Sequence, residues 1–149
     1  PWFGLNFTFK TMQYRLCADG IIDRYRFEYG LDGGGKHFYM ADPSEPIKDR
    51  VIICEGAKKA IVTWFNLTDV NKFTVIAASS NNTLSPALEA TKDCGQRILI
   101  LDPGSERIAF KTAREKKNIT PLHLPMKIDD MFLAGYLERE DFYSMLSAL

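Results

Sequence analysis

The clearest structural pattern in the sequence is Val51-Ile52-Ile53-Cys54-Glu55-Gly56-Ala57-Lys58-Lys59-Ala60. Its apolar run ends in Glu55, and a glycine then leads into a helix-forming sequence. The same order recurs at residues 97–106, where an apolar run ends in Asp102 and Gly104 follows. Short, continuous apolar runs bounded by a turn signal are typical of strands buried on both faces, and parallel sheets consist of such strands. The sequence therefore predicts Glu55 and Asp102 at the carboxyl ends of two strands, where open α/β sheets bind their ligands.

Strands and helices alternate through the rest of this region. Further strands are expected at residues 74–78 and 120–124, and helices at residues 57–67, 85–93 and 105–117. Strands that alternate with helices of this length predict right-handed βαβ units and a parallel sheet. The predicted fold class is α/β, a mainly parallel sheet flanked by helices on both faces.

The first 46 residues follow a different pattern, because they are aromatic and irregular. Alternation over residues 21–29 predicts a half-buried strand, and the glycines of residues 30–35 predict a turn into a second strand at residues 37–40. Residues 1–46 are therefore expected to form a small antiparallel, β-rich annex. The turn-rich residues 42–46 connect it to a main domain at residues 47–149.

Composition narrows the classes of function. The chain has 149 residues, 46% of them hydrophobic, which is enough for one domain with a real core and a small appendage. Its 19 basic and 19 acidic residues give zero formal charge, so an anionic partner must be held by a local patch. The chain begins at Pro1 without a methionine, and we expect it to be a piece of a longer protein.

The cysteines and the hydropathy pattern indicate the compartment. The three cysteines are far apart and form no Cys-x-x-Cys pair, which argues against a disulfide framework and against a zinc ribbon within this chain. No apolar run approaches the ~20 residues of a membrane span. We expect a reducing, cytoplasmic setting and no membrane partner.

Five carboxylates fall at or just beyond the expected strand ends: Glu55, Asp102, Glu106, Asp129 and Asp130. A convergent cluster of oxygens suits Mg²⁺, which keeps several waters and binds one or two carboxylates together with substrate phosphates. The alternative is that these residues are solvated loop residues or helix caps. Cys54, beside Glu55, is interpreted as a small core residue because no histidine is placed to activate it.

At these residues the sequence resembles a known family. Residues 54–60 look like the glutamate motif of the toprim fold, which primases, topoisomerases and OLD-family nucleases share. Residues 101–106 look like its second, Asp-x-Asp motif. Lys127-Ile128-Asp129-Asp130 resembles the Lys-x-x-Asp segment that follows the last strand in primase-type members. The resemblance covers about residues 50–146 and is greatest to the primase-like toprims of phages and mobile elements.

The resemblance implies a Rossmann-like toprim sheet and metal-dependent nucleotidyl transfer, namely RNA primer synthesis on a DNA template. It implies Mg²⁺ or Mn²⁺ as cofactor, and NTPs, a single-stranded DNA template and neighbouring domains such as a helicase or a zinc ribbon as partners. The catalytic candidates are Glu55, Asp102 and Glu106, and Asp129 and Asp130 join them as candidate metal ligands.

One position departs from the family pattern, because Gly104 stands where the family has its second aspartate. Two alternatives therefore stay open beside the primase. One is a toprim nuclease that cleaves phosphodiesters, and the other is a catalytically degenerate module that binds nucleic acid.

Basic residues supply candidate contacts to phosphates. Lys58 and Lys59 lie one turn from Glu55, and three further cations recur at helical spacing after Asp102. Such a stripe can also be a solvated helix face. The candidate nucleotide or nucleic-acid ligands are Lys58, Lys59, Arg107, Lys111, Arg114, Arg24 and Arg26.

Overall fold

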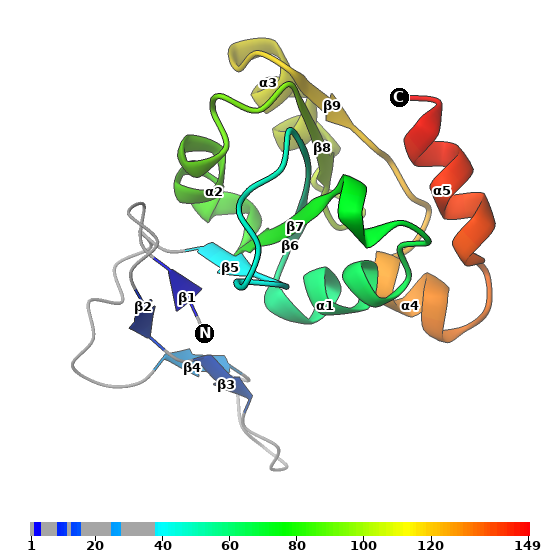
Figure 1. Cartoon of the computed structure of the whole chain (residues 1–149), viewed down its shortest axis with the longest axis horizontal. Helices are drawn as coiled ribbons and strands as arrows, with labels where there is room; N and C mark the ends of the chain where they lie inside the picture. Colours follow the sequence, from blue (N-terminus) through cyan, green and yellow to red (C-terminus); the bar gives the residue numbers. More distant parts are fainter. Residues whose placement is uncertain (1, 4–8, 12, 16–24, 28–37) are drawn as a thin grey trace.

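The structure is a computed structural model of the chain, and it describes residues 2–3, 9–11, 13–15, 25–27 and 38–149. Its main sheet has the strand order β2-β1-β5-β7-β6-β8-β9 (Figure 1). Four of these strands are mutually parallel: β6 (Arg50–Glu55), β7 (Thr74–Ala78), β8 (Gln96–Ile100) and β9 (Ile119–Pro121). The predicted fold class, a mainly parallel sheet in an α/β arrangement, is confirmed.

The antiparallel part of the sheet differs from the expectation. Strand β5 (Phe38–Met40) pairs with β7 and with β1 (Trp2–Phe3), and β1 pairs in turn with β2 (Phe9–Thr11). A separate pair joins β3 (Gln13–Arg15) to β4 (Tyr25–Phe27).

The expected hairpin between residues 21–29 and 37–40 is therefore wrong for the described residues. Phe38 and Met40 pack on one face of the sheet and Tyr39 on the other, so β5 is covered on both sides. A strand buried on both faces belongs inside a sheet. The division at residue 46 stays a prediction.

Helices cover both faces of the sheet (Figure 1). On one face α1 (Ala57–Phe65), α4 (Ile128–Leu133) and α5 (Arg139–Ser147) pack against Ile52, Cys54 and their neighbours. On the other face α2 (Ser85–Ala90) and α3 (Glu106–Glu115) pack against Val51 and Ile53. Alternate residues of β6 thus point to opposite faces, as the pleat of a strand requires. None of the helices in the described segments is long and apolar enough to cross a membrane.

All three helices predicted within residues 57–117, and the last predicted strand, are shorter than the sequence predicts. Helix α1 ends at Phe65, and α3 spans only Glu106–Glu115. Helix α2 ends at Ala90 and is followed by turns, and β9 ends at Pro121. Proline has no N–H to donate to a ladder, so it is confined to edge strands or strand ends, and β9 lies at the edge of the sheet. All of these differences lie at element ends and leave the order of strands and helices unchanged.

Candidate active site

Glu55 and Asp102 lie at the carboxyl edge of the sheet, which is the side where the parallel strands end. Strands β6 and β8 are parallel neighbours, with Cys54 opposite Ile100 in the register. Glu55 is the last residue of β6, and Asp102 follows β8 after Leu101. The predicted placement of both carboxylates at neighbouring carboxyl ends is confirmed.

Gly56 turns the chain from β6 into α1. Its φ of +86° lies in the left-handed region that favours glycine, and its N–H donates a 2.7 Å hydrogen bond to the carbonyl of Ala78 on β7. Because the turn is this tight, α1 begins at Ala57. Lys58 and Lys59 therefore lie in the first helical turn, directly above the strand that carries Glu55.

Three lysines pair with the carboxylates at this edge. Lys59 Nζ lies 3.1 Å from Asp102 Oδ1, and Lys127 Nζ lies 3.8 Å from Asp102 Oδ2. Lys58 Nζ lies 2.8 Å from Asp129 Oδ2. The ion pairs connect α1 to the loop after β8 and to the start of α4. Lys58 and Lys59 thus contact two of the candidate carboxylates, and their role as phosphate ligands stays a prediction. Sequence reasoning gave Lys127 no binding role of its own.

The structure brings Asp129, and not Asp130, into this network. Asp129 is only 4% exposed on the first turn of α4, whereas Asp130 is exposed to solvent. Burial opposes ionisation of Asp129, but the hydrogen bond and charge of Lys58, with the charge of Lys59, outweigh it and hold the pKa of this carboxyl below its usual value. Asp129 is therefore a carboxylate at neutral pH.

Two oxygens of the site are buried without a partner. Among the described residues, three buried side-chain polar atoms accept or donate no hydrogen bond: Glu55 Oε2, Asp129 Oδ1 and Arg97 Nε. Arg97 lies near the start of β8, at the opposite edge. An unpaired buried carboxylate oxygen is costly, and a ligand of opposite charge removes that cost. Carboxylate oxygens of this kind are the ligands that hard cations such as Mg²⁺ and Mn²⁺ prefer.

The carboxylates are, however, spread rather than gathered. In the described part of the chain, no group of three or more histidine, cysteine, aspartate or glutamate side chains is arranged to hold a metal ion. Asp102 and Asp129 each face a lysine ammonium instead. A divalent ion on Asp102 would therefore have to replace an ammonium group, whereas Asp129 Oδ1 has no such partner among the described residues.

Glu106 lies close to Gly104, the position that departs from the toprim motif which the sequence resembles. The Gly104 N–H donates a 2.8 Å hydrogen bond to Glu106 Oε1. This bond, with one from the backbone of Glu106 itself, lowers the pKa of the Glu106 carboxyl. Glu106 is exposed at the start of α3, so its carboxylate is ionised, in contact with residue 104 and open to solvent.

A side-chain bond that the sequence did not reveal fixes this loop. Asn81 Nδ2 donates a 2.9 Å hydrogen bond to Ser105 Oγ, which joins the segment after β7 to the start of α3. Ser105 is 5% exposed. No sequence signal shows which of the polar residues at 79–83 reaches α3.

The remaining candidates are the arginines and the lysine of α3 and two arginines of the N-terminal region. Arg107, Lys111 and Arg114 are exposed along α3. Arg26 belongs to β4, and Arg24 lies outside the described residues.

Cys54 is fully buried, as a core residue should be, with its Sγ 3.6 Å from Thr63 Oγ1. Burial raises the pKa of its thiol to about 12. The thiol therefore stays protonated at neutral pH, and the interpretation of Cys54 as a core residue is confirmed.

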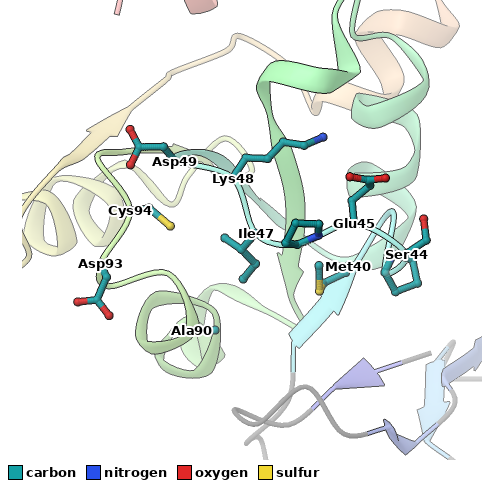
Figure 2. A pocket seen from close by; sticks show the side chains of 11 residues that line it. Met40, Ser44, Glu45, Ile47, Lys48, Asp49, Ala90, Asp93 and Cys94 are labelled. Atoms are coloured by element: carbon teal, nitrogen blue, oxygen red, sulfur yellow. The ribbon is translucent and has the colours of Figure 1, made fainter.

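A separate hollow of about 790 Å³ lies at the opposite edge (Figure 2). The connector before β6, the end of β5 and the residues after α2 line it. Its Asp49 accepts a 2.6 Å hydrogen bond from the Gly95 N–H, and a Cβ at residue 95 would lie only 2.4 Å from Asp49 Oδ2. This aspartate holds the starts of two strands together and is remote from the carboxylates of the site.

Comparisons with known proteins concern the fold. No family model matches the chain, and no curated protein matches it. Among solved structures, the chain is similar to the crystal structure of the primase fragment of the bacteriophage T7 primase-helicase protein, with a TM-score of 0.70 and 13% sequence identity. The match covers 99% of this chain and 61% of that chain, so this chain spans less than two thirds of the T7 fragment. The chain has a primase-like fold.

Proposed function

We propose that this chain is a toprim-type domain of a primase-like replication protein and that it catalyses metal-dependent nucleotidyl transfer. The observation that carries the proposal is the convergence of Glu55 and Asp102 at adjacent parallel strand ends, beside the buried carboxylate of Asp129. The fold likeness to a primase fragment supports it. The product would be an RNA primer made on single-stranded DNA.

The residues present fit a divalent cation. Glu55 and Asp102 would be its principal ligands, because Glu55 has an unpaired buried oxygen and Asp102 lies at the neighbouring strand end. Glu106 and Asp129 are further candidates, whereas Asp130 is exposed. When bound, Mg²⁺ or Mn²⁺ would supply positive charge against the triphosphate and the leaving group.

The lysines would then act on the nucleotide. Lys58, Lys59 and Lys127 already lie within ion-pair distance of the carboxylates at this edge. Released from them by a metal ion, their ammonium groups would donate charge-assisted hydrogen bonds to phosphate oxygens. Their role would be to hold and orient an NTP against the end of the growing primer.

The second candidate is a module that binds nucleic acid without catalysis. The observations that favour it are Gly104 and the pairing of both aspartates with lysines, which leaves the described carboxylates dispersed. A nuclease would use the same carboxylates, so only its product distinguishes it.

One reaction separates the three functions. The chain is incubated with a labelled single-stranded DNA template, labelled NTPs and Mn²⁺, and both labels are followed on a denaturing gel. New or growing RNA is the expected result, and shortened template with no RNA would replace the proposal by a nuclease. If the template is unchanged and no RNA is made, at template concentrations that saturate binding, the chain is a module that binds nucleic acid without catalysis. The Asp102→Asn variant is the negative control.

Residue 104 provides a finer test of the metal site. A Cβ at Gly104 would meet no heavy atom within 4 Å, so an aspartate has room, but the φ of +92° strains any L side chain. That strain costs on the order of 1 kcal/mol. Gly104→Asp is expected to tighten Mn²⁺ binding a few-fold, as measured by calorimetric titration, because it adds a carboxylate close to Asp102. The strain should appear as a lower free energy of unfolding, since it is present with and without the metal ion.

Gly104→Asn is the matched control, because it carries the same strain without the charge. It should bind Mn²⁺ no better than the parent chain. Equal affinities for Asp and Asn would contradict a role for residue 104 in the metal site. In all three proteins Mn²⁺ should bind more tightly than Mg²⁺, because it lies higher in the affinity order and tolerates irregular geometry.

A further inference from the structure

An exposed aromatic ring lies among the cations of α3. Phe110 is 55% exposed, although α3 buries Ala109 against the sheet and has an apolar face available. Its ring contacts that of His123, with the centroids 4.7 Å apart and the planes at 34°. Phe110 and His123 thus form a pair of aromatic rings at the surface of the molecule.

The cations surround this ring. Arg107 precedes Phe110 by three residues and Arg114 follows it by four, so the three side chains share one helix face. Lys111 is adjacent. Together with Glu115 they line a depression of about 630 Å³. We call Arg107, Phe110, Lys111, Arg114 and His123 the α3 surface.

The positive charge of this surface is largely uncompensated. Among the described residues, neither Arg107 nor Arg114 has an ion-pair partner within 4.0 Å, and Lys111 lies 3.8 Å from the exposed carboxylate of Glu115. An exposed pair of this kind contributes little. Since the whole chain has no net charge, the α3 surface is a local positive patch.

We propose that the α3 surface binds single-stranded nucleic acid, with an unpaired base stacked on Phe110 and phosphates held by Arg107, Lys111 and Arg114. Every base has a π-face, so stacking on an aromatic ring combined with cations along the backbone is how proteins hold single strands without reading sequence. In a duplex these faces are already stacked on one another, so a ring on a helix surface favours the single strand.

The inference rests on the proposed function and deepens it by locating the template. Helix α3 begins four residues after Asp102, at the carboxyl edge of the sheet. From Arg107 to Arg114 it runs about 10 Å away from that edge. A strand lying along the α3 surface would therefore lead to the carboxylates of the candidate active site.

The test is binding of fluorescein-labelled oligothymidylate to the purified chain, followed by anisotropy without metal or NTPs. Phe110→Leu keeps an apolar side chain but removes the ring, and it should weaken binding about fivefold or more, because one stacked base contributes ~1–3 kcal/mol. Phe110→Trp, which keeps an aromatic ring, should bind as tightly as the parent chain. The affinity for duplex DNA should not depend on the residue at position 110. Phe65→Leu is the matched control, since Phe65 is a 61% exposed aromatic on α1, and it should bind as the parent does.

The cations are tested through the salt dependence. Changing Arg107, Lys111 and Arg114 together to Gln should reduce the slope of log affinity against log salt by about two, at ~0.7 per phosphate contact for single strands. If the triple variant has a reduced slope but Phe110→Leu binds as the parent does, the cations bind phosphates and the stacking on Phe110 is wrong. If the slope of the triple variant is unchanged, the α3 surface is not the binding site. The binding assay involves no catalysis, so it tests the α3 surface independently of the proposed function. Oligonucleotide binding by a chain that makes no primer would contradict the proposed function and leave the α3 surface in place.

Discussion

Glu55→Gln is expected to reduce primer synthesis by more than about a hundredfold. The substitution preserves the shape of the side chain but replaces one carboxylate oxygen by a neutral NH₂ group, so its effect reports the role of the carboxylate as a charged ligand. Loss of a residue that merely supports a metal ligand typically costs 10–100-fold, and loss of a ligand should cost more. Glu55 Oε2 is buried without a hydrogen-bond partner among the described residues, and a bound cation would remove the cost of that burial.

The measurement is incorporation of labelled NTP at saturating Mn²⁺, with thermal unfolding of each variant as the check on folding. Asp102→Asn should show a loss of similar size because both carboxylates would bind the same ion. Glu45→Gln is the control, since Glu45 is an exposed glutamate in the connector at the opposite edge of the sheet. Full activity of Glu55→Gln would contradict the proposed function, because Glu55 would then not be a ligand that the reaction needs.

The parts of the site that the sequence predicted are those fixed by local pattern. A buried apolar run followed by a carboxylate and a glycine specifies a strand, its carboxyl end and the turn into a helix. Two such runs in a βαβ arrangement must end at the same edge, so Glu55 and Asp102 could be placed together in advance.

The parts that it missed depend on contacts between distant segments. Asp129 and Asp130 are adjacent, and only the phase of α4 against α1 decides that Asp129 is buried beside Lys58. The partner of β5 could not be predicted either, because a three-residue strand carries too little pattern to select its neighbour. Phe110 was missed because apolar residues on a helix are assigned to the core by default, and only the packed structure shows that this one is exposed.

The lysine pairs of the site have a consequence for catalysis. Lys59 Nζ lies 3.1 Å from Asp102 Oδ1, and the two side chains are only 16% and 19% exposed. In the proposed site a metal ion and Lys59 would compete for the same carboxylate, while Lys59 would also be needed for the phosphates of the nucleotide. Removing its charge should therefore affect metal binding and catalysis in opposite directions.

Lys59→Met, which keeps most of the apolar stem, is expected to tighten Mn²⁺ binding about tenfold, because the site loses one positive charge beside Asp102. It should also lower kcat/KM for NTP about a hundredfold, since a hydrogen bond to a charged group contributes ~1.5–3 kcal/mol and the phosphate would lose its partner. Calorimetry with Mn²⁺ and initial rates of incorporation give the two values from the same preparation.

Lys92→Met is the matched control, because Lys92 is also ion-paired, with Glu89 at 2.8 Å, but is exposed after α2. It should change neither value. If Lys59→Met lost both metal affinity and activity, Lys59 would be a structural support for the loop that carries Asp102. Unchanged metal affinity would instead place the ion away from Asp102. Tighter Mn²⁺ binding together with a lower kcat/KM is the result expected if Lys59 pairs with Asp102 in the absence of the metal ion and binds the nucleotide phosphates in its presence.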